Sequence, residues 1–123
     1  MIKRSRYSYL VTLSMLKERI ASGGNTIFAE IDQAAAAGEA GLHLRPTTLI
    51  VFGNPKGGTP LMDAFPLMAL DLPLKLVVWE GSDGVEIAYV PMSEIAARYG
   101  VTGMEERIAA MDAALERLTG SVV

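Results

Sequence analysis

The segment "TTLIVFG" at residues 47–53 constrains the fold of this chain more than any other stretch. It is apolar on both faces of the strand that it would form, and it is rich in β-branched residues. A strand of this kind belongs in the centre of a sheet, where its neighbours keep it from water. The chain has 123 residues, which is enough for one such core, and we expect a single domain over 1–123.

Further strands are predicted on both sides of this segment. Residues 74–80 and 85–90 are strand-like, and the Asp-Gly pair at 83–84 between them is a strong signal for a hairpin. A short first strand is expected within 2–7. The short turn between 74–80 and 85–90 predicts that these two strands pair antiparallel.

Residues 26–32 alternate in the way of a half-buried strand. We expect one face of this strand to carry Ile27, Ala29 and Ile31, and the other face to carry Phe28, Glu30 and Asp32.

Two longer segments have apolar residues at helical spacing. The first runs from Ser8 to Ser22 and should end at Gly23. The second runs from Thr102 to Gly120, and Thr102 with Glu105 would form a capping box. The apolar positions are Leu10, Leu13, Leu16 and Ile20 in the first helix and Met104, Ile108, Met111, Leu115 and Leu118 in the second.

Shorter helices are predicted at 33–41, from Thr59-Pro60 onward and at 92–100. In the second of these, Thr59 would cap the helix and Pro60 would occupy its first turn. The order of elements predicts an α+β fold, with helices packed on one face of a largely antiparallel sheet.

Composition excludes several classes of function. There is no cysteine, so disulfides, zinc thiolate sites and thiol catalysis are excluded. The net charge of −3 argues against nucleic-acid binding, which needs a basic face. No stretch reaches the roughly 20 apolar residues of a membrane span, and the charged residues 1–10 do not resemble a signal peptide. We expect a cytoplasmic protein that binds neither membranes nor nucleic acid.

The loop "GNPKGGTPLM" at 53–62 is glycine-rich and contains a lysine, as phosphate-binding loops do. Gly53 and Gly58 have the spacing of a P-loop, but Thr59 stands where the motif needs its lysine. A weaker anion site remains open, in which Lys56, the helix dipole and free amides at Gly57, Gly58 and Thr59 attract a negative group. The alternative is that the loop only turns the chain.

The histidine, the methionines and the carboxylates give weaker indications of a catalytic or metal site. His43 is the only histidine, and a metal site needs more ligands than one residue supplies. The seven methionines have no spacing that favours metal or haem, so no cofactor is expected. Glu30, Asp32 and Glu80 could do acid–base work only if one of them were buried.

The stretch 44–80 resembles the DUF302 family, whose pattern reads R-P-T, F-G-N-P, G-T-P-L-M, D-L-P-L-K and W-E. The resemblance extends over nearly the whole chain. It implies a fold similar to the TATA-binding-protein-like arrangement, of β-α-β(4)-α type, and a homodimer, and it implies no established activity. The chain departs from the family pattern at Gln33, where many members have histidine, and at Val90-Pro91-Met92-Ser93, where many have an N-D-P-like turn.

Three functions remain open. The first is a small-molecule or anion-binding accessory module. The second is an interaction homodimer without a ligand site. The third is an enzyme in which Glu80, Lys75 and Lys56 converge. For the first, the expected ligand-binding residues are Arg45, Asn54, Lys56, Gly57, Gly58, Thr59 and Lys75.

Overall fold

The computed structural model describes residues 1–123, which form five strands, five α-helices and one 3-10 helix. In chain order these are β1 (Ile2–Arg4), α1 (Tyr9–Ser22), β2 (Thr26–Asp32), α2 (Gln33–Glu39), β3 (Thr47–Gly53), α3 (Pro55–Ala64), η1 (Pro66–Leu70), β4 (Leu74–Gly81), β5 (Gly84–Ala88), α4 (Met92–Arg98) and α5 (Glu105–Gly120).

The strands form one sheet in the order β1-β5-β4-β3-β2, and every neighbouring pair is antiparallel. The predicted hairpin is confirmed, with Gly81 opposite Gly84 where β4 turns into β5. Gly84 has φ 141°, a backbone conformation that side-chain-bearing residues rarely adopt. The predicted central strand is also confirmed, since β3 lies between β2 and β4.

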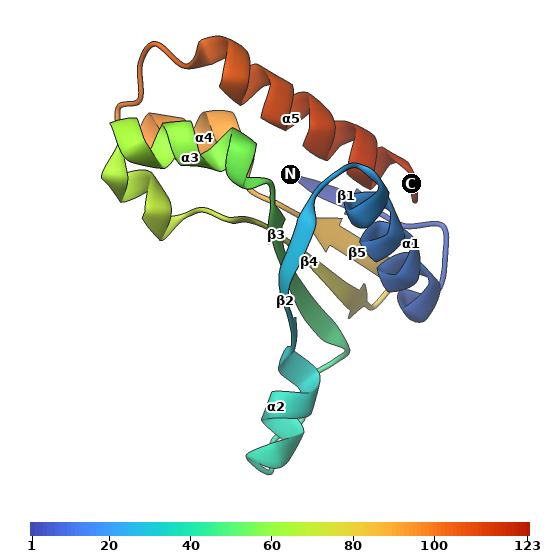
Figure 1. Ribbon diagram of the computed structural model, residues 1–123. Coiled ribbons are helices and arrows are strands. Elements are labelled where there is room, and N and C mark those ends of the chain that lie inside the picture. The colour runs from blue at the N-terminus through green and yellow to red at the C-terminus, as the bar shows by residue number, and fades with distance from the viewer.

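Four helices, α1, α3, α4 and α5, lie on one face of the sheet (Figure 1). The side chains of Ile50, Phe52, Leu76 and Val78 point to this layer and are almost completely buried. They belong to one cluster of 19 buried apolar residues. The α+β architecture with helices on one face of an antiparallel sheet is therefore confirmed.

A β-bulge in β2 changes the predicted pattern of faces. Ile27 pairs with Phe52, whereas Ala29 pairs with Val51, so the register shifts by one residue between them. Ile27 therefore faces the helices while Ala29 faces the opposite side, and the expectation that they share a face was wrong.

The first helix also differs in detail from its prediction. Leu10 is 75% exposed, so it is not part of the buried stripe. Thr12 is buried in its place, and its hydroxyl lies 2.7 Å from that of Ser5, which satisfies both groups. The stripe thus includes a polar residue that apolar periodicity could not reveal.

Two helix starts were predicted wrongly. Helix α3 begins at Pro55 with Asn54 as its N-cap, five residues before the predicted start at Pro60 with Thr59 as the cap. Helix α5 begins at Glu105, and no side chain caps it. The Glu105 carboxylate accepts a hydrogen bond from the Gly103 amide at 3.0 Å, so the capping box with Thr102 does not form.

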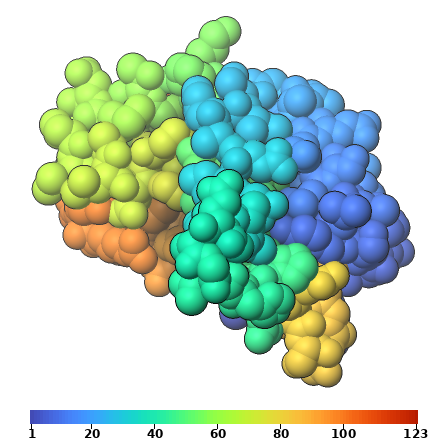
Figure 2. Space-filling view, turned by 90° about the horizontal axis from the view of Figure 1, so that it is seen from below, coloured from blue at the N-terminus to red at the C-terminus, as the bar shows by residue number.

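Helix α2 extends away from the rest of the molecule beyond the end of β2 and β3 (Figure 1). None of its residues is buried. From below, it stands between the α3–η1 segment on one side and α1 on the other (Figure 2).

No helix in the structure has both the length and the apolar character needed to cross a bilayer.

Candidate functional site

The predicted anion cradle at the start of α3 has no free amides to offer. The Lys56 amide donates to the Asn54 side chain at 2.9 Å. The Gly57 and Gly58 amides donate to the Asn54 carbonyl at 2.9 and 3.1 Å, and Thr59 lies within the helix. Asn54 therefore accepts the hydrogen bonds that were expected to hold an anion, and this part of the prediction is wrong.

Arg45 and Lys75 do not join this loop. Arg45 precedes β3 and Asn54 follows it, and the seven residues of β3 span roughly 20 Å at about 3.3 Å each. The Lys75 ammonium donates to the backbone carbonyls of Asp71 and Pro73 at 3.0 and 3.1 Å, which occupies it in a turn. The predicted ligand residues therefore do not form one site.

The residues of the enzyme hypothesis do not converge either. Lys75 and Glu80 occupy positions of opposite parity along β4, so their side chains lie on opposite faces of the sheet. Neither they nor Lys56 lines either of the two cavities described below. His43 is exposed, and no group of three or more His, Asp or Glu side chains is placed to hold a metal ion.

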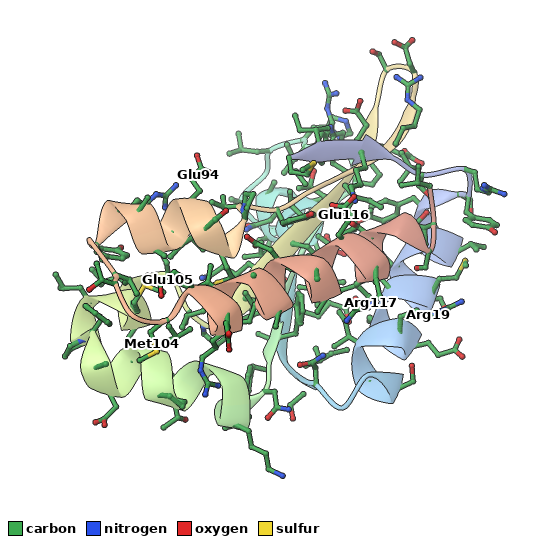
Figure 3. The ribbon with its side chains drawn as sticks, turned by 90° about the horizontal axis from the view of Figure 1, so that it is seen from above. Arg19, Glu94, Met104, Glu105, Glu116 and Arg117 are labelled. Carbon is green, nitrogen blue, oxygen red and sulfur yellow. The ribbon has the colours of Figure 1, made fainter.

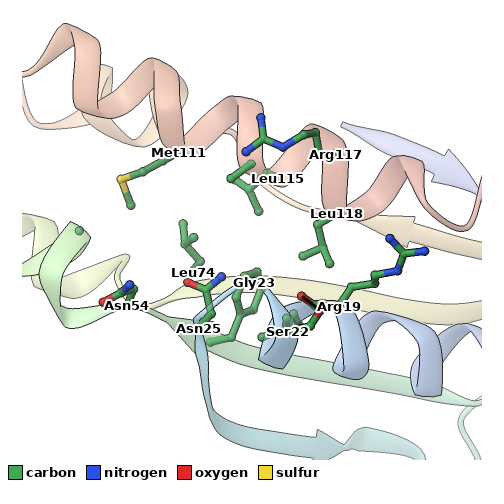
Figure 4. A pocket seen from close by; sticks show the side chains of 14 residues that line it. Arg19, Ser22, Gly23, Asn25, Asn54, Leu74, Met111, Leu115, Arg117 and Leu118 are labelled. Carbon is green, nitrogen blue, oxygen red and sulfur yellow. Dashed lines mark hydrogen bonds between the residues drawn. The ribbon is translucent and has the colours of Figure 1, made fainter.

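The main cleft, of about 410 Å³, lies between the C-terminal part of α1, the C-terminal half of α5 and the N-terminus of α3 (Figures 3 and 4). Its volume is in the range of sites for small molecules. Its walls are formed by Arg19, Ile20, Ser22, Gly23, Asn25, Phe52, Asn54, Gly57, Leu74, Met111, Ala114, Leu115, Arg117 and Leu118.

Two arginines give this cleft its charge. Arg19 from α1 and Arg117 from α5 both line it, and in Figure 4 the Arg117 guanidinium extends along α5 toward Met111 whereas that of Arg19 lies at the far end of the cleft. They are the only ionisable side chains that line the cleft, and neither takes part in any of the four ion pairs of the structure. The cleft is thus cationic although the chain as a whole is acidic.

Each arginine alone has a simple structural explanation. Arg19 and Arg117 lie in the last turns of α1 and α5, where a cation complements the helix dipole. The helix dipole does not explain why both arginines line the same cavity, or why no carboxylate lines it. That both arginines line one cavity is therefore a feature of the cleft as well as of the helices.

A smaller cavity of about 130 Å³ adjoins the main cleft, because Asn54, Leu74 and Met111 line both. Its other walls come from the bulge of β2, the first turns of α3 and the start of β4. They are Phe28, Gly53, Pro55, Gly58, Thr59, Met62, Leu72 and Pro73. Apart from Phe28 and Met111, all residues that line it belong to the motif segments quoted above.

The turn that forms one wall of this smaller cavity is held from both sides. The Asp71 carboxylate accepts a hydrogen bond from the Tyr99 hydroxyl and lies 3.5 Å from the Arg98 guanidinium. The bond to Asp71 raises the pKa of Tyr99 above its usual value, and partial burial adds to this rise. Lys75, which donates to the carbonyls of Asp71 and Pro73, holds the same turn from the other side.

Sequence reasoning missed Arg19 and Arg117. Each immediately precedes a residue of the apolar stripe of its helix, Ile20 and Leu118, and so lies at the margin of the buried face. That position is the only signal in the sequence, and it does not reveal that the two helices meet there. Of the predicted residues, Asn54 and Gly57 line the main cleft, and Asn54, Gly58 and Thr59 line the smaller cavity.

Comparison with known proteins gives two kinds of similarity. The chain is 42% identical over 80 residues to the fluoride-specific ion channel FluC 1 of Brucella suis biovar 1 (strain 1330), which is 65% of this chain and 32% of that protein. The same identity and length hold for FluC 2 of Brucella melitensis biotype 1, of which 30% is covered. The chain therefore spans about a third of the length of these curated relatives.

The fold is similar to that of an uncharacterized conserved DUF302 protein from Bacillus stearothermophilus. The TM-score with that crystal structure is 0.91 over 100% of this chain and 97% of the other, at 17% sequence identity, so this likeness concerns the fold. The profile of the family described as a domain of unknown function, DUF302, matches residues 1–118, and the chain therefore belongs to the DUF302 family.

Proposed function

We propose that this chain is an accessory module that binds a small anion in the main cleft. The observation that carries the proposal is the pair Arg19 and Arg117, which line one cavity without a carboxylate among its walls. The proposal moves the anion site away from Lys56, Arg45 and Lys75.

The chemistry of the cleft suits a carboxylate or a phosphate. A guanidinium offers five donors in a planar fork that matches these groups. Hydrogen bonds between ionised partners are shorter and stronger than neutral ones. The amide side chains of Asn25 and Asn54 and the hydroxyl of Ser22 line the same cleft and add further polar contacts.

Thermal unfolding of the purified chain with phosphate, sulfate, acetate and benzoate tests this proposal. A ligand that binds the folded state raises the midpoint of unfolding with its concentration. We expect a rise with at least one carboxylate or phosphate at millimolar concentration, and its loss in the double variant Arg19→Gln/Arg117→Gln. Arg45→Gln is the matched control, because Arg45 is exposed and lines neither cavity.

The two outcomes are distinct. A rise that Arg45→Gln retains and the double arginine variant loses supports the cleft as the site. No rise with any of the anions, or an equal rise in the double variant, overturns the proposal.

Fluoride is a second candidate ligand, favoured by the name of the curated relatives, fluoride-specific ion channels. In those proteins about two thirds of the length lies outside the matched segment, so this chain would correspond to an accessory part. Sodium fluoride with sodium chloride as control joins the same experiment. Stabilisation by fluoride that chloride does not reproduce, and that the double arginine variant loses, would favour this candidate, and equal curves for the two salts would remove it.

Self-association is the second function that we propose, and it rests on the sheet face opposite the helices. The pairing of the strands places one apolar residue on this face from each of the five strands, in a continuous row. The row is Ile31, Leu49, Val77, Ala88 and Ile2. None of the five is buried, and Ile2 is 66% exposed. An apolar row of this length, uncovered by any helix, is typical of an interaction surface.

Charged residues flank the row on both sides. On one side Lys75 pairs with Val51, and on the other side Glu86 pairs with Trp79. On the second side Arg4 lies 3.9 Å from Glu86, so that side carries both signs of charge. We propose a second copy of this chain as the occupant because a two-fold axis along the row would bury the same apolar row on both partners.

Light scattering at micromolar concentration tests this second function. We expect twice the 13.2 kDa of the single chain, and a return to the single mass in Val77→Glu. Leu10→Glu is the control, since Leu10 is 75% exposed on α1, away from this face. A single-chain mass for the unaltered protein would rule out the dimer.

A further inference from the structure

The two cavities adjoin each other and have chemically different walls. Asn54, Leu74 and Met111 line both, so these residues lie at their boundary. Figure 4 shows Met111 and Asn54 at the end of the main cleft remote from Arg19. A ligand with its charged group at the arginines would reach the smaller cavity by extending past Met111.

The smaller cavity is suited to hydrocarbon. No ionisable side chain lines it, and its polar side chains are only Asn54 and Thr59. Phe28, Met62 and Leu72 supply most of its apolar surface. Its volume of about 130 Å³ is several times the ~30 Å³ that one water molecule occupies in the liquid. Burying apolar groups there is favourable, whereas an ion would lose its hydration without gaining a partner.

We infer that the ligand of this site is an amphipathic carboxylate, with its charged group at Arg19 and Arg117 and a short hydrocarbon chain in the smaller cavity. This inference rests on the proposed anion-binding function and specifies its ligand class. The thioether side chains of Met62 and Met111 are flexible and adapt to chains of different shape. The turn held by Asp71, Tyr99 and Lys75 provides the rigid opposite wall.

Gly58 offers a direct way to close the smaller cavity. A Cβ at this position would lie 3.6 Å from Met62 Cε and 3.9 Å from Leu72 Cδ1, which is ordinary van der Waals contact. Gly58 is not among the glycines with positive φ, so a side chain there causes no backbone strain. Since Gly58 lies within α3, alanine also suits its helical conformation better than glycine does. Gly58→Ala should fold, and Gly58→Leu should fill more of the cavity.

The experiment measures the dissociation constants of acetate, butanoate, hexanoate and octanoate by calorimetry. Each methylene buried from water should strengthen binding by about fourfold, until the smaller cavity is full. We expect the gain from butanoate to octanoate to shrink in Gly58→Ala and to vanish in Gly58→Leu, while acetate binds equally to all three proteins. Gly38→Leu is the control, because Gly38 lies on α2 with open space around it.

The inference and the function on which it rests fail in different ways. If acetate and octanoate bind with equal affinity, or if Gly58→Leu leaves the gain from chain length unchanged, the amphipathic ligand is overturned and the anion site remains. If none of the four carboxylates binds, and phosphate and sulfate do not bind either, both are overturned.

Discussion

Lys3 on β1 and Glu116 on α5 form an ion pair, with 2.9 Å between Nζ and Oε1, that connects the first strand to the last helix. Only 14% of the Lys3 side chain is exposed, and its ammonium also donates to the Thr119 hydroxyl at 2.8 Å. The Tyr89 hydroxyl donates to the second carboxylate oxygen of Glu116 at 3.0 Å. Four side chains, from β1, from α5 and from the residue that follows β5, thus form one network at the edge of the sheet.

This network should make stability depend on pH in the acid range. The hydrogen bond from Lys3, followed by that from Tyr89, lowers the pKa of Glu116 in the folded chain. A lowered folded-state pKa contributes stability that is fully present above the unfolded-state pKa and is lost as the pH falls through the folded-state value. In urea unfolding between pH 7 and pH 3, the difference between the unaltered chain and Glu116→Gln should shrink toward the acid end. A difference that is constant with pH would contradict this.

Tyr89 should add a dependence on pH at the alkaline end. Burial, then the hydrogen bond and charge of Glu116, raise the pKa of Tyr89 from 10.0 to about 12. The folded chain therefore holds this proton more tightly than the unfolded chain does, and the associated stability is present below pH 10 and is lost toward pH 12. Tyr89→Phe should unfold with less dependence on pH over this interval. Spectrophotometric titration at the tyrosinate band, with the same variant as reference, would measure the shift directly.

The fold was predictable where the decisive contacts are local. The Asp-Gly hairpin and the apolar strand of residues 47–53 specify their structure with neighbouring residues only. The exposure of Leu10 and the bulge after Ile27 depend on what the neighbouring elements cover, so periodicity alone could not reveal them. The candidate site is harder still, because Arg19 and Arg117 come to line one cavity only when α1 and α5 pack side by side.

Leu10 and Leu16 allow the difference between an exposed and a buried apolar position to be tested within one helix. Leu16 is 0% exposed and Leu10 is 75% exposed. We expect Leu16→Ala to reduce the free energy of unfolding by about 2–5 kcal/mol, because it leaves a cavity in the core. Leu10→Ala should change it by less than about 0.5 kcal/mol. Chemical denaturation of both variants measures the difference, and similar losses would mean that Leu10 is buried in solution.

Asp112 caps helix α4, and no motif in the sequence predicts this cap. Its carboxylate accepts hydrogen bonds from the amides of Met92 and Ser93, at 2.6 and 3.1 Å, and so caps α4 from α5. Pro91 at the N-cap position supplies no side-chain hydrogen bond of its own. Asp112→Ala should cost about 0.5–2 kcal/mol of stability, the range of a lost helix cap. Asp112→Asn keeps an acceptor oxygen and should retain part of the stability, and equal losses in the two variants would count against the capping role.

Arg107 explains how α3 can start at Pro55 with a proline at position 60. Pro60 has no N–H, so the Lys56 carbonyl, four residues earlier, lacks its helical donor. The Arg107 guanidinium from α5 lies 3.4 Å from this carbonyl and 3.5 Å from that of Gly57, and it supplies the missing donor. The sequence prediction placed Pro60 in the first turn because it could not know that a distant arginine makes an interior proline acceptable.

A double-mutant cycle tests this dependence of α3 on α5. Arg107→Met keeps an apolar stem of similar length but removes both donors, and it should cost about 0.5–1 kcal/mol, since the two hydrogen bonds are long. Pro60→Ala restores an N–H that can donate to the Lys56 carbonyl, so Arg107→Met should cost less in that background. Urea unfolding of the four proteins gives the coupling free energy. A coupling indistinguishable from zero would show that Arg107 and Pro60 act independently, and that α3 tolerates its proline for another reason.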